Sequence, residues 1–368
     1  MRVLVMTSPF PTHLTPIVPL AWALRAAGHE VLVVCQPDVA AAAGRAGLNV
    51  AVVGGEYDDI GRRRRAKPVF ARAEEDGSRP WQVFARGWQA RVDTLLGPSA
   101  DVARAWRPDL IVADPLEFVA PRLAHALDIP YAHHRWGVDV HGDERWWRAC
   151  QALSGGQGEG MPDPAAVFDP CPPGLQAPGL SPGSGIRFVP YNGTGSRPAL
   201  PPWQRDATCV SFGTRAVALG GADLLRVTLR ALIGPVLVAA PAGTREALGE
   251  VPDGVTVLED VPLSLVLDRC ALVIHHGGAG TTLTATAFGL PQLVLPQAPY
   301  LVEHGERLAA TGAGALLLAE EQREENIRSA VAGLLTGAAG RAARALAAGT
   351  AAQPTPADWV GPLEKIAG

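Results

Sequence analysis

The sequence is poor in several features, and each shortage argues against a class of protein. Its five cysteines are scattered without a C-x-x-C pair, which argues against a zinc site and fits a reducing cytosol. Lys and Arg number 32 against 36 Asp and Glu, and the net charge of −4 argues against a general nucleic-acid binder. No apolar run approaches the ~20 residues of a membrane helix. The N-terminus reads as a strand rather than a signal peptide. We therefore expect a cytoplasmic protein with no nucleic-acid or membrane partner.

Two patterns of other nucleotide-binding proteins are also missing. The loop after the first expected strand has no glycine, and Gln36 rather than an acidic residue follows the second strand. Both features disfavour a dinucleotide-dependent enzyme. No Lys follows the glycines at 277–280, so this stretch is not a P-loop.

What remains is the composition of a globular α/β protein. The chain has 368 residues, of which 48% are hydrophobic and 18% charged, enough for two domains with substantial cores. Arg2–Met6 and Glu30–Cys35 read as buried strands, and apolar residues repeat at helical spacing between them. Such β-α-β units build parallel sheets. Residues 191–206 are rich in Gly, Pro, Ser and Asn, which is typical of a linker, and the strand–helix alternation restarts after them.

The most informative stretch is 272–282. Residues 272–274 form a short apolar strand, a glycine-rich turn follows, and the next residues can begin a helix. A helix N-terminus suits phosphate because its N–H groups are unpaired and its dipole is positive there. His276 lies just before the turn and can donate a hydrogen bond to a phosphate oxygen.

Two side chains at strand ends are candidates for acid–base chemistry. His13 lies beyond the carboxyl end of the first strand, and Asp114 ends the strand expected at 109–114. Ligands of open α/β sheets bind at this edge. A carboxylate bonded to a histidine Nδ1 fixes its tautomer and stabilises the imidazolium. The alternatives are a solvated histidine and a helix N-cap.

The turn also carries a family resemblance. Residues 275–281, His-His-Gly-Gly-Ala-Gly-Thr, resemble the nucleotide-diphosphate motif of the glycosyltransferases that decorate macrolide and polyketide antibiotics. Segments 131–139, 169–176 and 189–193 look like their counterparts in polyketide-tailoring members, so the resemblance covers most of the chain.

The resemblance implies a GT-B fold, in which two Rossmann-like, doubly wound parallel-sheet domains face a central cleft. Residues 1–198 would bind the acceptor and residues 199–353 the nucleotide sugar, while 354–368 would cross back to the first domain. It also implies an inverting transferase that moves a sugar from a dTDP- or UDP-sugar to a polyketide or macrolide-like aglycone. The donor is a substrate, and no cofactor is expected. No D-x-D triplet occurs in the chain, so we expect no metal assistance.

The site residues follow from matching positions. His13 would be the general base, and Asp114 would orient it. The loop at 211–214 would reach phosphate or the donor, and segment 261–264 would meet the nucleobase through main-chain groups. Aromatic rings would line an apolar acceptor cavity. The alternatives are a strand-ending turn, a helix start and core packing. Residues 56–80 read as a solvated loop or as a lid over the acceptor pocket. Donor binding is expected at Gly213, Thr214, Val261, Leu263, His276, Gly277, Gly278, Gly280, Thr281, Glu303 and His304, and acceptor binding at Phe10, His134, Trp136, Trp146 and Tyr300.

One segment departs from the family pattern. Where the family usually has an Asp-Gln pair that binds sugar hydroxyls, this chain has Tyr300 and Leu301. Neither offers the paired acceptors of those residues. Either Glu303 and His304 compensate, or the donor is a deoxysugar with fewer hydroxyls, or the protein is a non-catalytic relative that binds an aglycone or a partner enzyme. An epimerase of the same fold is disfavoured, because that chemistry needs more acid and base residues. The sequence leaves a homodimer open.

Overall fold

The computed structural model describes residues 1–58, 61, 81–139, 153, 161–200, 206–213 and 221–368. The lid expected over 56–80 lies largely outside these residues, and so do Trp146 and Thr214.

The first domain is built on a parallel sheet with the strand order β3-β2-β1-β4-β5-β6-β7 in the described part. The two strands at the centre of the sheet are apolar and largely buried, as expected for a sheet covered on both faces. Its strands are β1 (Arg2–Met6), β2 (Glu30–Cys35), β3 (Asn49–Val52), β4 (Leu110–Ala113), β5 (Tyr131–His134), β6 (Ala166–Asp169) and β7 (Ser184–Gly185). Its helices are α1 (Pro11–Leu14), α2 (Val18–Ala26), α3 (Pro37–Arg45), α5 (Trp81–Trp106) and α6 (Val119–Leu127).

The second domain repeats the architecture, with the order β10-β9-β8-β11-β12-β13 among the described strands and parallel pairing throughout. Its strands are β8 (Ala207–Ser211), β9 (Val236–Ala240), β10 (Val255–Glu259), β11 (Cys270–His275), β12 (Gln292–Val294) and β13 (Gly314–Leu316). Its helices and short 3-10 turns are α8 (Ala222–Ala231), α9 (Thr244–Leu248), η2 (Leu263–Leu265), η3 (Leu267–Arg269), α10 (Ala279–Ala287), α11 (Pro299–Ala310), η4 (Ala319–Glu321), α12 (Glu324–Leu334) and α13 (Gly337–Ala352).

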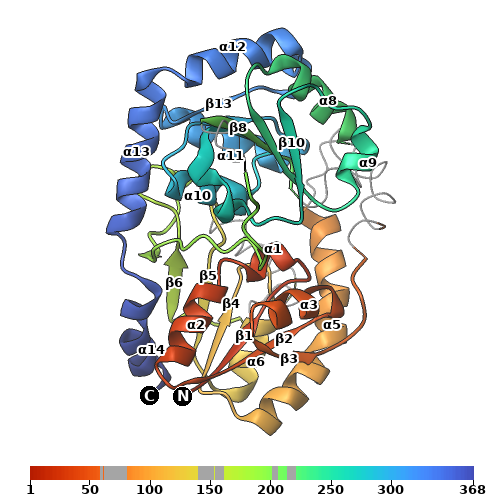
Figure 1. Ribbon diagram of the computed structural model, residues 1–368. Helices are drawn as coiled ribbons and strands as arrows, with labels where there is room; N and C mark the ends of the chain where they lie inside the picture. Colours follow the sequence, from red (N-terminus) through yellow and green to blue (C-terminus); the bar gives the residue numbers. More distant parts are fainter. Residues whose placement is uncertain (59–60, 62–80, 140–152, 154–160, 201–205, 214–220) are drawn as a thin grey trace.

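Helices cover both faces of each sheet. In the first domain, α2 and α3 pack on one face and α5 and α6 on the other, so two separate apolar clusters flank the sheet. In the second domain, α8 and α12 cover one face, while α10 and the η2–η3 segment cover the other. Figure 1 shows the two domains stacked one above the other. The expected α/β class with two Rossmann-like sheets is therefore confirmed.

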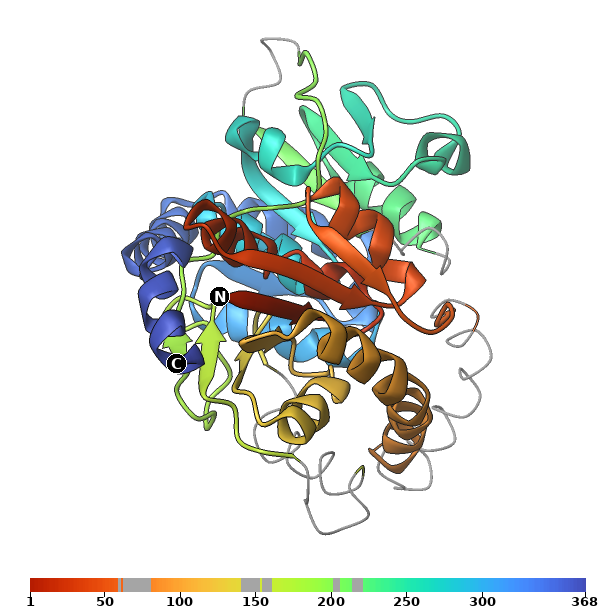
Figure 2. The same ribbon diagram turned by 90° about the horizontal axis from the view of Figure 1, so that it is seen from below.

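The C-terminal segment returns to the first domain. The long helix α13 runs along the side of the second domain, and η5 (Pro356–Trp359) and α14 (Val360–Ala367) follow it along the side of the first domain (Figure 1). Leu363 is fully buried in the first domain's core, and the Trp359 indole donates to the Gly185 carbonyl at 3.1 Å. The two chain ends consequently lie close together, as the view from below also shows (Figure 2). The domain limits at residues 198 and 353 remain predictions.

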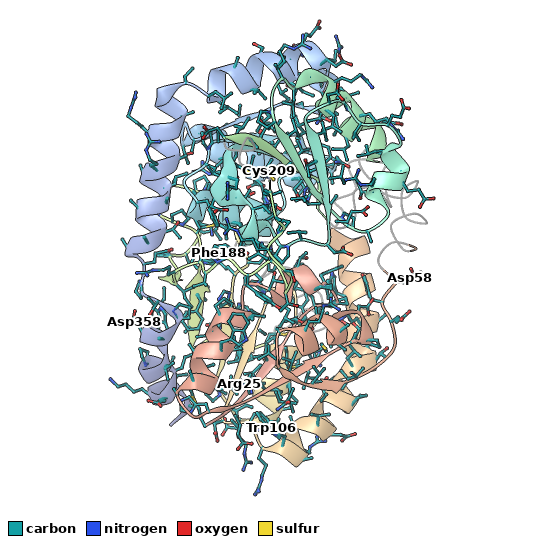
Figure 3. All side chains as sticks on the ribbon, in the orientation of Figure 1. Arg25, Asp58, Trp106, Phe188, Cys209 and Asp358 are labelled. Atoms are coloured by element: carbon teal, nitrogen blue, oxygen red, sulfur yellow. The ribbon has the colours of Figure 1, made fainter. Side chains whose placement is uncertain are left out.

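A mixed apolar cluster joins the two domains. Phe188 lies between them in Figure 3 and is 7% exposed. Because such a cluster excludes water from the contact, it holds the two sheets in a defined relation. Its buried members are Val138, Cys171, Leu175 and Phe188 from the first domain, and Leu283, Val294, Leu308, Ala313, Ala343 and Leu346 from the second.

One local expectation needs correction. The stretch after the first strand, residues 7–15, is not simply a loop, because Pro11–Leu14 form a helical turn; proline is well suited to its first position. In a later part of the domain, β5 begins at Tyr131. The proline at 130 has no N–H to donate, so the regular ladder begins after it.

Candidate active site

The topology brings four loops to one region. In each sheet the strand order changes direction beside the first strand, between β1 and β4 and between β8 and β11. Open α/β sheets bind ligands at this point, outside the carboxyl ends of the strands. Met6 is level with Ala113, and Ser211 is level with His275. The residues that follow each pair therefore emerge side by side.

His13 and Asp114 are in contact. Asp114 Oδ1 lies 3.3 Å from His13 Nδ1, the carboxylate is fully buried, and the imidazole is partly exposed. Burial alone raises the pKa of the Asp114 carboxyl, but the charge and hydrogen bond of His13 and the N–H groups of Ser8 and Leu116 outweigh it. The net pKa is lowered, so the carboxylate stays ionised beside the histidine. The Leu116 N–H also donates to Asp114 Oδ1 at 2.9 Å, so the carboxylate caps a turn. The helix N-cap alternative is wrong, because α6 begins later and its N-cap is Phe118.

A third side chain joins this pair that sequence reasoning missed. The Ser8 hydroxyl lies 2.6 Å from His13 Nδ1 and 3.0 and 3.1 Å from the two Asp114 oxygens. The Ser8 N–H also donates to Asp114 Oδ2 at 2.6 Å. Its position two residues beyond the carboxyl end of β1, next to the end of β4 that Asp114 follows, was the available signal.

Aromatic rings surround the histidine. Trp136 stacks on His13 with centroids 4.2 Å apart and an angle of 12°, and Phe10 is tilted against it at 5.0 Å. Tyr57 continues the row, 5.9 Å from Phe10 and 6.3 Å from the Trp88 ring. Phe10, Tyr57 and Trp136 are each only partly buried. The structure thus brings the expected residues Phe10 and Trp136 to His13 and adds Tyr57, which sequence reasoning did not single out.

On the facing domain, two glycines confine His276. A Cβ atom on Gly213 would lie 2.6 Å from His276 Cε1, and one on Gly278 would lie 2.5 Å from Nε2. Gly213 also has a φ of +75°, which other residues rarely adopt. The ring is therefore held beside the N-terminus of α10. Gly280 and Thr281 belong to the first turn of that helix, where N–H groups have no partner within the helix.

Two buried histidines fix the turn itself. The Gly277 N–H donates to His275 Nδ1 at 3.0 Å, and His275 Nε2 lies 3.0 Å from Gln292 Oε1. Burial lowers the pKa of His275 to about 3, so it is neutral and can accept at Nδ1. His304 Nδ1 donates to the Gly277 carbonyl at 2.8 Å. The polar groups of Gly277 are thus used within the protein, so a ligand at this turn would meet the N-terminus of α10 instead.

The segment after β5 connects the two halves of the site. Trp136 stacks on His13, and a Cβ on the next residue, Gly137, would lie 2.6 Å from the Cβ of Ala279. Ala279 is the first residue of α10. The histidine of the first domain and the helix N-terminus of the second are therefore separated by one tryptophan and one close backbone contact.

The region expected to meet a nucleobase is held from the linker. Leu263 is buried at the start of η2, and Val261 is partly buried. The Ser264 N–H donates to Asn192 Oδ1 at 3.1 Å, and Asn192 Nδ2 donates to the Thr284 hydroxyl at 2.9 Å. The Asn192 amide therefore fastens the linker to both η2 and α10, a role that sequence reasoning missed.

Four further expected site residues lie on β5 and α11. His134 lies within β5, is 2% exposed and bonds the Arg135 carbonyl through Nδ1, so its geometry does not favour contact with an acceptor. His304 is 5% exposed and faces the Gly277 turn rather than an open sugar site. Tyr300 and Glu303 lie on α11, and Glu303 is partly buried. The side chain of Tyr300 is outside the described part.

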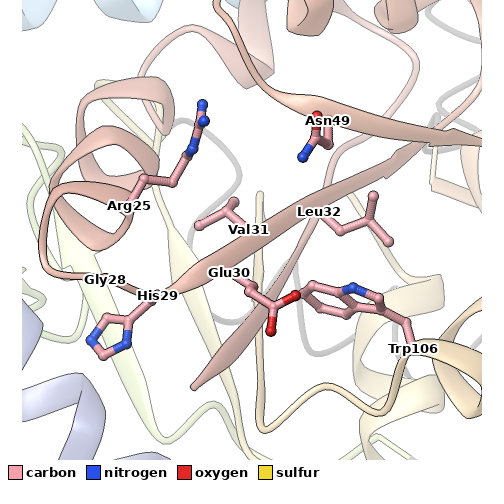
Figure 4. Close-up of a pocket in the computed structure, with 8 residues that line it drawn as sticks. All are labelled: Arg25, Gly28, His29, Glu30, Val31, Leu32, Asn49 and Trp106. Atoms are coloured by element: carbon pink, nitrogen blue, oxygen red, sulfur yellow. The ribbon is translucent and has the colours of Figure 1, made fainter.

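Other features of the described residues carry no catalytic chemistry. No group of three or more His, Cys, Asp or Glu among them is arranged to hold a metal ion. No helix in the described ranges is long and apolar enough to cross a membrane. One pocket of about 370 Å³ lies at the amino ends of β2 and β3, where Arg25, His29 and Trp106 contribute to its lining (Figure 4). It is at the edge of the sheet opposite His13 and Asp114.

Comparison with known proteins decides the family. Residues 22–209 match the N-terminal domain, and residues 226–366 the C-terminal domain, described as erythromycin biosynthesis protein CIII-like. The tylactone mycaminosyltransferase of Streptomyces fradiae is 32% identical over 425 residues, covering 100% of this chain and 92% of the relative. The L-demethylnoviosyl transferase of Streptomyces niveus is 33% identical over 380 residues, covering 97% and 96%. The chain belongs to the erythromycin biosynthesis protein CIII-like glycosyltransferases.

Solved structures agree with this assignment. The spinosyn rhamnosyltransferase SpnG superposes with a TM-score of 0.88 at 37% identity, covering 99% of this glycosyltransferase and 100% of that chain. SpnG is also known in complex with thymidine diphosphate, at a TM-score of 0.86 and 36% identity. Its complex with spinosyn aglycone gives 0.87 and 35%. The resemblance in the sequence, the GT-B fold and the expectation of an enzyme are confirmed.

Proposed function

We propose that this glycosyltransferase moves a deoxysugar from a thymidine diphosphate sugar to a hydroxyl of a macrolide or polyketide-like aglycone, with inversion and without a metal ion. The observation that carries the proposal is the short path between its two halves. The Ser8–His13–Asp114 cluster at one switch point is joined to the N-terminus of α10 at the other through Trp136 and Gly137. SpnG, known in one complex with thymidine diphosphate and in another with spinosyn aglycone, has the same fold at 35–36% identity.

His13 acts as the general base in this mechanism. Its Nδ1 is bound to Ser8 and Asp114, so Nε2 is the nitrogen left to take the proton of the acceptor hydroxyl. The ionised Asp114 stabilises the imidazolium that forms. Attack from the face opposite the leaving group inverts the anomeric carbon. Phe10, Tyr57 and Trp136 supply apolar ring surface next to the base, which suits a large, poorly polar acceptor.

The leaving diphosphate is stabilised by the second domain. Its charge falls on His276 and on the unpaired N–H groups at the start of α10. Since the described residues offer no cluster of metal ligands, these groups carry the charge in our proposal.

The apolar residue at 301 favours a sugar with few hydroxyls. Leu301 is 6% exposed, and its backbone oxygen would lie 3.1 Å from a Cβ on Gly277, so it packs directly against the turn. His304 is already bonded to Gly277 and is poorly placed to replace the missing hydroxyl contacts. A deoxysugar loses less binding free energy in such a site than a fully hydroxylated sugar, because fewer of its hydroxyls are left without a hydrogen-bond partner. The non-catalytic alternative is not favoured, because the relatives are enzymes.

A product assay tests the proposal. The protein is incubated with a panel of thymidine and uridine diphosphate sugars and macrolide or polyketide aglycones, and products are analysed by mass spectrometry and for anomeric configuration. We expect a deoxysugar product of inverted configuration that persists in the presence of a chelator. His13→Ala should lower turnover by about 10²–10⁴-fold, and Asp114→Asn by less. A fully hydroxylated hexose used in preference to every deoxysugar would contradict the donor assignment, and a retained configuration would contradict the mechanism.

A further inference from the structure

The hydroxyl of Ser8 occupies the position between the base and its carboxylate. Ser8 Oγ is 2.6 Å from His13 Nδ1, whereas the nearest Asp114 oxygen is 3.3 Å from the same nitrogen. The shorter contact is that of a strong hydrogen bond, and the longer lies at the outer limit. Asp114 therefore acts on the imidazole largely through the hydroxyl.

The direction of each proton follows from the charges. Asp114 is ionised and can only accept, and it lies within 3.0 Å of the Ser8 hydroxyl. A charged acceptor binds a hydroxyl proton more strongly than a neutral ring nitrogen does. The Ser8 O–H therefore donates to Asp114, and its oxygen is left to accept from His13 Nδ1–H. That arrangement keeps the Nε2 lone pair free for the acceptor hydroxyl.

From this geometry we propose that Ser8 is a positioning residue for the base, which fixes the reactive tautomer of His13 and relays the stabilising effect of Asp114 to it. The inference rests on the proposed function, in which His13 is the base.

The arrangement differs from a hydrolase triad. In that triad the serine and the carboxylate bind opposite nitrogens of the histidine, and the serine attacks the substrate. Here both contact Nδ1, and Ser8 is fully buried, so it has no path to a substrate. Among neighbouring titratable groups, His133 also senses the Asp114 charge, but burial lowers its pKa to about 4 and it stays neutral near pH 7.

The same stretch of backbone provides a matched control. Thr7 is fully buried, and its hydroxyl has no hydrogen-bond partner within the described ranges. Thr7→Val removes a hydroxyl next to Ser8 without removing a bond. Ser8→Ala removes the hydroxyl but keeps the backbone N–H that donates to Asp114. Ser8→Thr retains a hydroxyl and tests for rescue.

The test compares pH–rate profiles and the tautomer of His13. We expect Ser8→Ala to lower turnover by about tenfold or more, the loss expected for one bond to a charged partner. The acid limb of the Ser8→Ala pH–rate profile should move to lower pH, because the His13 imidazolium loses the hydroxyl oxygen that accepts its Nδ1–H. The KM for the donor should stay unchanged. Thr7→Val should have the turnover and the pH–rate profile of the wild type. Folded Ser8→Thr protein should have its acid limb at the wild-type pH.

Nitrogen-15 NMR of the histidine side chains gives a readout that needs no active variant at Ser8. The wild-type His13 signal, assigned with His13→Gln, should show Nδ1 protonated and Nε2 bare at neutral pH. An Nε2-protonated ring, or a Ser8→Ala profile and tautomer identical to the wild type, would overturn the proposal. If His13→Ala keeps wild-type turnover, the proposed base itself is wrong, which is a separate outcome.

Discussion

The confinement of His276 between glycines yields a quantitative prediction. A Cβ on Gly278 would lie 2.5 Å from His276 Nε2 and 2.8 Å from Cε1, about 1 Å closer than two such atoms tolerate. The ring in Gly278→Ala must therefore turn away by roughly that distance. A hydrogen bond to phosphate does not survive such a shift. Its loss corresponds to about 1.5–3 kcal/mol, or a Kd for thymidine diphosphate raised about 10- to 150-fold.

A double-mutant cycle isolates the cause. His276→Ala should raise the Kd for thymidine diphosphate by the same factor as Gly278→Ala, because both substitutions remove the same hydrogen bond. The double variant should bind thymidine diphosphate as tightly as His276→Ala alone, because the methyl group added at Gly278 then meets no imidazole ring. Isothermal titration calorimetry of the four proteins measures all of these values.

Gly333→Ala serves as the control substitution. Gly333 lies in α12 and a Cβ there would meet nothing within 4 Å. We expect wild-type affinity, with a free energy of unfolding equal to the wild type or up to about 1 kcal/mol higher. Wild-type binding by Gly278→Ala would refute the steric reasoning. Full additivity in the double variant would instead mean that the methyl touches the ligand itself.

The remaining predictions concern stability, the acceptor and the domain contact. Burial lowers the pKa of His133 and His134 to about 4 and of His275 to about 3, whereas unfolded histidines titrate near 6.5. The unfolded state therefore binds more protons below about pH 6.5, and the free energy of unfolding should fall by up to about 4 kcal/mol per pH unit toward pH 4; a flat value between pH 7 and 5 in urea titrations would contradict this. Trp136→Ala should raise the KM for the aglycone and leave the Kd for thymidine diphosphate unchanged; equal losses of both would show that the ring serves the donor. Gly137→Ala should lower the free energy of unfolding by about 1–3 kcal/mol through overpacking against α10, and an unchanged urea midpoint would mean that the domain contact yields easily.

Local signals in the sequence are sufficient to predict the fold and the contact between His13 and Asp114. Arg2–Met6 and Glu30–Cys35 match their predicted strands residue for residue, because apolar runs between turn residues have few other solutions. The glycine turn at 277–280 was recognisable for a similar reason, since close packing around His276 requires residues without side chains. His13 and Asp114 could be paired because both follow parallel strands, whose carboxyl ends meet at one edge.

The rest depended on contacts between segments far apart in the chain, for which a single sequence has no local signal. No local signal distinguishes Ser8 from other loop serines. Only the pairing of β1 with β4 brings its hydroxyl oxygen to 3.0 Å from Asp114 Oδ2. Asn192 looks like a linker residue until the second domain folds back over it. The sequence offers His304 as a contact for sugar hydroxyls, but the docking of α11 directs its ring to the Gly277 carbonyl instead. The sequence by itself determined which residues have suitable chemistry, whereas tertiary packing decided which of them remain available to a substrate, because burial and hydrogen-bond partners are set only when the sheets close.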